Sequence, residues 1–248
     1  MAMTLLHGGG DDPDWRRASL GPLLDLIALA AEPRLAMVVC EASPQDEAES
    51  VRAYAEILQA AAPVPITVAP LLVTPEAPLT AEALLAARPA GLFVCGGLTP
   101  RYHEALCGET GWLDALRELG LPYGGTSAGA AIAAETAIVG GWLATWAGRP
   151  RAMLFRGASE GLDELAARPG LGLLPGAIDM HASQSGTLLR LVHAVALGAA
   201  PHGWAIDENT ALVLDGPGAA PRVVGAGHVY RVAGGAGGAA QVTILTAG

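Results

Sequence analysis

Short apolar runs alternate with helical segments along the first half of the chain, and this alternation constrains the fold more than any other feature. The runs expected to form buried strands are 35–40, 65–73 and 91–95, and the expected helices are 46–61, 80–87 and 100–119. Strands that alternate with helices form a parallel sheet with helices on both faces. Because 248 residues with 52% hydrophobic content can bury one sizeable core, we predict one α/β domain over residues 1–248, with three layers and a mostly parallel central sheet.

The second half of the chain has fewer regular patterns. Apolar runs at 171–178, 211–214, 222–224 and 241–245 predict later strands, with a helix at 187–197 and a flexible turn at 234–240. Residues 140–161 are rich in Gly, Trp and Arg and show little periodicity. This segment is either a lid that faces the substrate or an insertion packed by its own aromatic side chains.

A G-x-S-x-G motif, Gly125-Thr126-Ser127-Ala128-Gly129, follows the short apolar run 119–123. The motif is typical of a serine exposed on a sharp turn from a strand into a helix, where small neighbours relieve crowding. Ser127 is therefore a candidate nucleophile. An ordinary glycine-rich turn would fit the motif as well, so the interpretation depends on partners elsewhere in the chain.

A serine nucleophile requires a base and a group that orients the base. His181 is the strongest candidate for the base because it ends an apolar run and would project from the carboxyl end of a strand. The other histidines are expected in turn, helix or surface contexts: His7, His103, His193, His202 and His228. Glu208 and Asp207 compete for the third role, and only one of them can face the site because alternate residues of a strand point in opposite directions.

Composition excludes several classes of protein. All 14 basic residues are Arg, which rules out lysine Schiff-base chemistry and a P-loop. The net charge of -10 disfavours nucleic acids and anionic membranes as partners. The cysteines Cys40, Cys95 and Cys107 lack C-x-x-C spacing and are expected to be reduced, mostly in the core. We find neither a signal-peptide pattern nor a membrane-spanning run, and expect a cytoplasmic protein.

Four segments occur in a distinctive order along the chain: Gly96-Gly97, Gly125 to Ala130, Gly170 to Leu174 leading into Asp179-Met180-His181, and Ile206 to Ala211. In order and context they resemble the motifs of the peptidase S51 family, which contains cyanophycinase and dipeptidase E. The similarity extends from about Leu5 to Leu214. The resemblance implies a flavodoxin-like fold of the kind found in class I glutamine amidotransferases.

The resemblance also implies roles for individual residues. Ser127 would be the nucleophile and His181 the general base, with Glu208 as the acid because it matches the I-D-E-N-T-A motif of the cyanophycinase branch. The oxyanion hole would be formed by the backbone N–H groups of Gly97 and Ala128.

The positions that would contact the substrate depart from the family. Where the family has D-Q-H-F followed by spaced arginines, this chain keeps Asp179, His181 and Arg190 but loses the Gln, the Phe and two Arg positions. Leu98 and Thr99 occupy positions that are usually an acid or amide followed by Gln. These departures argue against cyanophycin as the substrate. Arg101, or the arginines of residues 149–156, would bind a substrate carboxylate.

The sequence therefore predicts a serine peptidase that hydrolyses a peptide or isopeptide bond of a small peptide, without a cofactor or metal. Two alternatives stay open, an esterase that takes its acid from Asp163 or Glu164, and a catalytically degenerate binding protein on the same fold. A glutamine amidotransferase needs a cysteine nucleophile, and position 127 is serine. An apolar surface at residues 23–31 or on the late strands would support a homodimer, although amphipathic helices also pack internally.

Overall fold

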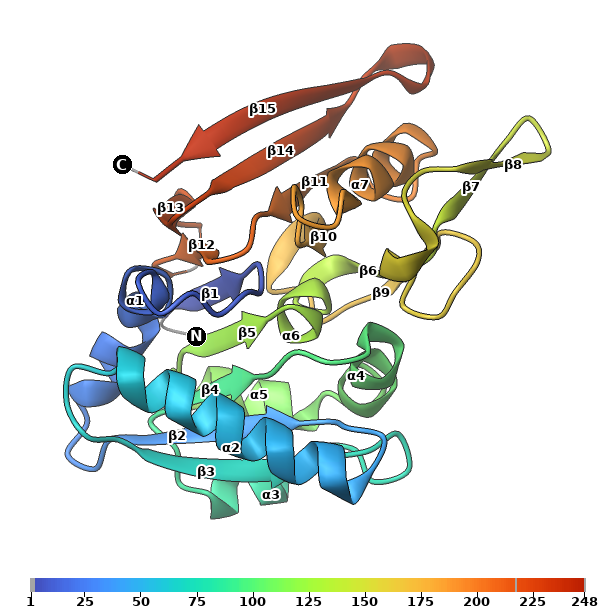
Figure 1. Ribbon diagram of the computed structural model, residues 1–248. Coiled ribbons are helices and arrows are strands. Elements are labelled where there is room, and N and C mark those ends of the chain that lie inside the picture. The colour runs from blue at the N-terminus through green and yellow to red at the C-terminus, as the bar shows by residue number, and fades with distance from the viewer. Residues whose placement is uncertain (1–2, 217, 248) are drawn as a thin grey trace.

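Two large β-sheets with helices packed on their faces, and a small two-stranded sheet, make up the described part of the protein (Figure 1). The structure is a computed structural model that describes residues 3–216 and 218–247. The larger sheet has seven strands in the order β13-β12-β1-β5-β4-β2-β3. These are β1 (Thr4–His7), β2 (Arg34–Val39), β3 (Thr67–Leu72), β4 (Gly91–Val94), β5 (Tyr123–Thr126), β12 (Thr210–Leu214) and β13 (Arg222–Gly225). The first five strands pair in parallel, and β12 and β13 extend the sheet in antiparallel fashion beside β1.

The second sheet has six strands in the order β15-β14-β11-β10-β6-β9. These are β6 (Ala134–Gly140), β9 (Ala166–Pro169), β10 (Leu174–Met180), β11 (His202–Ile206), β14 (His228–Gly234) and β15 (Ala240–Thr246). The central strand β10 is parallel to β6 and β11, and the outer strands are antiparallel. The β14–β15 hairpin forms the upper edge of the molecule in Figure 1.

The prediction of an α/β fold with large sheets flanked by helices is confirmed, but the prediction of one central sheet is wrong. Only residues 127–133 separate β5 from β6. A strand can return to the same sheet in parallel only through a crossover of roughly a dozen residues or more. The four-residue helix in this connection is too short for that, so the chain continues into a second sheet.

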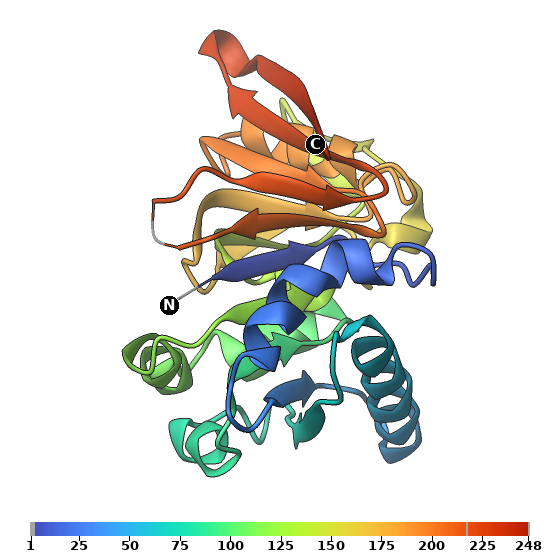
Figure 2. The ribbon, with the colours of Figure 1, turned by 90° about the vertical axis from the view of Figure 1, so that its left-hand side faces the viewer.

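Helices cover both faces of the larger sheet, and one helix packs on the second sheet. They are α1 (Arg16–Ala28), α2 (Pro44–Ala61), α3 (Ala81–Ala86), α4 (Thr99–Leu106), α5 (Gly111–Glu118), α6 (Ala128–Ala131) and α7 (Thr187–Ala196). α1 packs against α2 on one face and α3 against α5 on the other (Figure 2), while α7 packs on the second sheet. The predicted helix over 100–119 is interrupted between α4 and α5, where Gly108 and Gly111 lower the helical propensity.

A continuous set of buried apolar side chains joins the two sheets, and it includes Leu5 and Leu92 from the larger sheet and Ile178 and Ile206 from the second. α1 contributes Leu23, Leu24 and Ile27, which are fully buried. These side chains of the apolar stretch at 23–31 pack internally, whereas Leu29 is 82% exposed, and the homodimer stays a prediction.

Residues 140–161 fold into a small unit of their own. They contain the hairpin of β7 (Leu143–Trp146) and β8 (Arg149–Ala152) and a short 3₁₀ helix (Arg156–Ala158). The indole of Trp146 donates to Nδ1 of His193 at 2.9 Å, and that of Trp142 donates to Asp163 at 2.9 Å. The two indoles thus anchor the segment, as the second interpretation predicts, while Phe155 and Glu160 line a cavity with Ser127, as the first predicts.

Candidate active site

Ser127 lies at the end of β5, on a sharp turn into α6. Its backbone has φ 49° and ψ -114°, a conformation that is strained for a residue with a side chain. The flanking glycines allow this turn, because a Cβ on Gly125 would lie 2.5 Å from the carbonyl oxygen of Gly129, and one on Gly129 would lie 2.3 Å from that of Val94. The glycines of the motif are thus required by close packing of the backbone around Ser127.

Ser127, His181 and Glu208 form a continuous hydrogen-bonded chain. Oγ of Ser127 lies 2.9 Å from Nε2 of His181, and Nδ1 of His181 lies 2.8 Å from Oε1 of Glu208. The side chains of His181 and Glu208 are 28% and 31% exposed, so the group is accessible from solvent. Ser127 follows a strand of the larger sheet, whereas His181 and Glu208 follow β10 and β11 of the second sheet. The site therefore lies where the carboxyl ends of strands from the two sheets meet.

The glycine loop after β1 holds the two halves of the site together. The carbonyl of Gly8 accepts the backbone N–H of His181 at 3.1 Å, and that of Gly9 accepts the N–H of Asn209 at 2.7 Å. Gly9 has φ +94°, and a Cβ there would lie 2.2 Å from Cε1 of the His181 ring. The sequence analysis missed both β1 and this loop, and the run Gly8-Gly9-Gly10 was the available signal.

His7, the last residue of β1, is buried close to Ser127 and not in the turn or surface setting expected from the sequence. It is 3% exposed, and its Nδ1 lies 2.9 Å from Oγ1 of Thr126. Its carbonyl oxygen accepts the backbone N–H of Ser127 at 3.0 Å. Burial, together with the nearby His181, lowers the pKa of His7 to about 4. His7 is therefore neutral at physiological pH.

Two tyrosines hold the Gly96 peptide unit next to Ser127. The hydroxyl of Tyr54 accepts the N–H of Gly96 at 3.0 Å, and the hydroxyl of Tyr102 donates to its carbonyl at 3.0 Å. A Cβ on Gly96 would lie 3.0 Å from Cβ of Ser127, so the backbone approaches the nucleophile closely. In the part of the chain that the structure describes, the N–H groups of Gly97 and Ala128 have no hydrogen-bond partner.

The competing acid, Asp207, points away from His181. It is buried, and its carboxylate accepts the backbone N–H of Ser183 at 2.9 Å and that of His228 at 3.0 Å. Those bonds tie the ends of β10 and β11 to the start of β14. The structure thus brings Glu208, and not Asp207, to the imidazole.

Asp179 and Arg190, which the family resemblance places at the substrate, bind each other. They are 1% and 4% exposed, and both oxygens of Asp179 accept from the guanidinium at 2.7 Å. Arg190 also donates to the carbonyl of Ala158 at 2.7 Å. Both residues line a cavity that contains Ser127, but all three guanidinium nitrogens are engaged in these bonds, which favours a structural role in the cavity wall over direct binding of a substrate carboxylate.

The other two predicted substrate contacts are also engaged. Thr99 is buried at the start of α4, where its N–H donates to Oε2 of Glu160 at 3.0 Å. Arg101 donates to the backbone carbonyl of Glu41 at 3.1 Å. Arg156 is exposed and forms an ion pair with Asp163 at 3.6 Å. Neither Arg101 nor Arg156 is among the described residues that line the two cavities containing Ser127.

Two cavities adjoin Ser127 and His181. The larger one, of about 620 Å³, extends to α2 and the loops after β1, β2 and β4. The smaller one, of about 250 Å³, extends to the 3₁₀ helix and α7 and includes Phe155, Glu160 and Glu208. Ser127 therefore has open space on either side.

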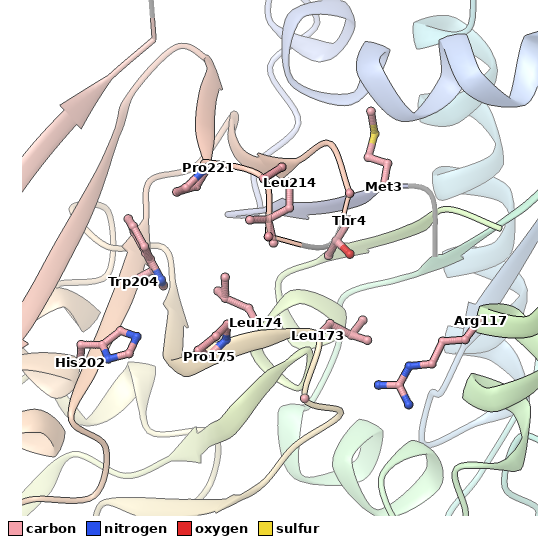
Figure 3. A pocket seen from close by; sticks show the side chains of 14 residues that line it. Met3, Thr4, Arg117, Leu173, Leu174, Pro175, His202, Trp204, Leu214 and Pro221 are labelled. Carbon is pink, nitrogen blue, oxygen red and sulfur yellow. The ribbon is translucent and has the colours of Figure 1, made fainter. Parts of the chain in front are cut away.

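A third cavity, of about 580 Å³, lies at the opposite ends of the strands. Figure 3 shows Leu174, Pro175 and Trp204 around it, with Arg117 at one side. It is lined by the starts of β1, β10 and β11 and the end of β12. Since the carboxyl ends of the parallel strands carry Ser127 and His181, this cavity is separate from the candidate site.

The cysteine thiols are unsuited to act as nucleophiles. Cys40 and Cys95 are buried and none of the three is in a disulfide. Burial raises the pKa of Cys40 to about 11 and that of Cys107 to about 12. Over residues 3–216 and 218–247, no group of three or more His, Cys, Asp or Glu side chains is arranged to hold a metal ion. No helix within the same ranges has the length and hydropathy needed to span a membrane.

Comparison with known proteins identifies a structural relative. No protein-family model and no curated protein sequence matches the chain. A solved structure, described as a peptidase from an acI-B1 Actinobacterium, is similar with a TM-score of 0.66 and 18% sequence identity. The match covers 100% of this chain and 95% of that chain. The protein thus shares the fold of that peptidase, while its membership of the S51 family stays a prediction.

Proposed function

We propose that the protein is a serine hydrolase that cleaves a peptide or isopeptide bond of a small peptide. The observation that carries this proposal is the hydrogen-bonded chain from Ser127 through His181 to Glu208, with distances of 2.9 and 2.8 Å. A serine hydroxyl is a weak nucleophile unless a base accepts its proton and a third group orients the base. In this site Ser127 is the candidate nucleophile, His181 the candidate base and Glu208 the candidate orienting group.

In this mechanism, Oγ of Ser127 attacks the carbonyl carbon while Nε2 of His181 accepts the hydroxyl proton. Glu208 accepts the hydrogen bond from Nδ1 and stabilises the imidazolium. His181 then gives the proton to the leaving nitrogen as the C–N bond breaks, which leaves an acyl ester on Ser127. A water molecule, deprotonated by His181, hydrolyses the ester and restores the serine.

The unengaged N–H groups of Gly97 and Ala128 are suited to bind the oxyanion of the tetrahedral intermediate. Each such donor typically contributes about 3–4 kcal/mol to transition-state stabilisation. The tyrosine contacts to Gly96 fix the orientation of the Gly96–Gly97 turn before the substrate binds. This arrangement avoids reorganisation during the reaction.

Peptide chemistry is favoured by the S51-like motifs and by the fold shared with a protein described as a peptidase. The esterase alternative would take its acid from Asp163 or Glu164. Asp163 instead accepts from Trp142 at 2.9 Å, and Glu164 from Thr145 at 3.1 Å. A degenerate binding protein would not need the Ser127–His181–Glu208 arrangement, and for that reason we rank it lower.

Labelling with a fluorophosphonate probe, read by intact mass, tests the proposal without knowledge of the substrate. Wild type should acquire one label at neutral pH, and Ser127→Ala and His181→Ala should acquire none while keeping their fold by circular dichroism. A peptide and isopeptide library then identifies the scissile bond. Wild type that resists labelling, or a Ser127→Ala variant with full peptide turnover, would exclude the mechanism.

A further inference from the structure

We propose that Glu41 makes the larger cavity selective for substrates with a positively charged group, either an Arg or Lys side chain or a free amino terminus. The inference rests on the proposed hydrolase function and concerns the specificity of the same site. It is carried by the position of Glu41 beside Gly97 and by the balance of charges around the two cavities.

The larger cavity connects the nucleophile to one face of α2. Its volume is about 620 Å³, and Ser127 and His181 form part of its wall. The α2 residues that line it recur at helical spacing, which places them on one side of the helix: Asp46, Glu49, Ser50, Ala53, Tyr54 and Ile57. A substrate group that leaves Ser127 in this direction therefore meets α2.

Glu41 is the carboxylate of this cavity nearest to the oxyanion-hole glycine. A Cβ built on Gly97 would lie 3.6 Å from Oε1 of Glu41. The hydroxyl of Ser50 donates to that oxygen at 2.7 Å and so fixes the carboxylate. Arg101 donates to the backbone carbonyl of Glu41, but no basic group of the described chain lies within 4.0 Å of its carboxylate.

Both cavities are lined by acids, but the larger one has more acids without an ionic partner. In the smaller cavity, Asp179 pairs with Arg190 and Glu208 contacts His181, and Glu160 has no ionic partner among the described residues. In the larger cavity, Asp11 pairs with Arg16, whereas Glu41 and the two acids of α2 have no ionic partner within the described residues. A cation in this cavity would face three carboxylates, and the half-buried position of Glu41 leaves its charge less screened than a fully exposed one would be.

Protection of Ser127 from labelling tests the inference before the substrate is known. A neutral fluorophosphonate probe would be used with and without agmatine, a small guanidinium compound, and with a neutral urea of similar shape. We expect agmatine to slow labelling of wild type at least about tenfold at millimolar concentration, an effect that weakens as salt increases. The neutral urea should give little protection.

Variants assign the effect to named residues. Glu41→Gln should abolish the protection by agmatine, and Glu49→Gln should reduce it in part. Glu47→Gln is the matched control, because Glu47 lies on the same helix but does not line the cavity, and it should behave as wild type. Protection that persists in Glu41→Gln, or equal protection by agmatine and the urea, would overturn the inference.

Peptides then distinguish the two sources of the charge. If wild type cleaves Arg or Lys peptides in preference to norleucine analogues, and Glu41→Gln loses this preference through a rise in KM, the cavity binds a basic side chain. Selective cleavage of free over acetylated peptides assigns it to an amino terminus. If wild type does not label with the probe alone, the proposed hydrolase function fails. Calorimetric titration of agmatine into wild type and Glu41→Gln then tests the cation site independently of that function.

Discussion

The imidazole Nδ1 of His7 lies 2.9 Å from Oγ1 of Thr126, the residue that immediately precedes Ser127. The same histidine holds Ser127 through its backbone carbonyl. The neutral imidazole of His7 therefore helps to position Ser127. The pKa of His7 is lowered to about 4 mainly because burial disfavours the charged ring, and to a smaller extent by repulsion from His181.

The lowered pKa of His7 predicts a loss of stability in mild acid. The unfolded chain binds a proton near pH 6.5, but the folded chain does so only near pH 4. The contribution of neutral His7 to the unfolding free energy is present in full above pH 6.5. It is lost as the pH falls from 6.5 towards 4. Between pH 7 and 5, wild type should lose about 2 kcal/mol more unfolding free energy than His7→Asn, measured by urea denaturation. His228→Asn, which removes an exposed histidine, should retain the wild-type pH dependence.

Gly9→Ala should disable the site while leaving the protein folded. The new methyl group would lie 2.2 Å from the His181 ring, so the imidazole must move away from Ser127. A misplacement on the order of 1 Å typically costs about 10²-fold in rate, and we expect a loss of that order in the fluorophosphonate labelling rate. Gly148→Ala also introduces a side chain at positive φ, but with nothing within 4 Å. If both variants label at the same rate, the clash with His181 is not the cause.

Glu208 and Asp207 are adjacent but should behave differently on substitution. Glu208→Gln keeps the shape of the side chain, but its amide can donate to Nδ1 and so favour the tautomer that cannot accept the Ser127 proton. A loss on the order of 10⁴-fold in labelling rate is expected. Asp207→Asn should instead lower the unfolding free energy by about 1–3 kcal/mol, because Asp207 accepts two backbone N–H groups. A reversed pattern would transfer the orienting role to Asp207.

The buried pair of Asp179 and Arg190 should be required for stability. Arg190→Met leaves an unpaired carboxylate in the core, and the expected cost is about 3–5 kcal/mol in unfolding free energy. The double variant Asp179→Leu/Arg190→Met should recover part of this loss, since it removes both charges. Denaturant unfolding of the two variants beside wild type measures the difference. A single variant as stable as wild type, with a raised KM for peptides, would restore the substrate-binding role predicted for Arg190.

Much of the local structure could be predicted from the sequence. The strands at 35–40 and 91–95 are continuous apolar runs, and the helix at 46–61 has helical spacing of apolar residues. Ser43 caps α2 by accepting the N–H of Asp46. The hairpin turn between β14 and β15 falls at the glycine-rich stretch 234–240. By contrast, β1 has only four residues, too few to show a period.

The sequence by itself determined which residues have the chemistry: a serine on a glycine-flanked turn, a histidine after an apolar run, and an acidic pair of which one member faces the site. Only the tertiary structure decided how they meet. It separated the strands into two sheets, brought His181 to Ser127 across their junction through the Gly8–Gly10 loop, and selected Glu208 over Asp207. It also paired Asp179 with Arg190. Local patterns report the period and polarity of one segment, whereas these contacts depend on the register and packing of strands that are far apart in the chain.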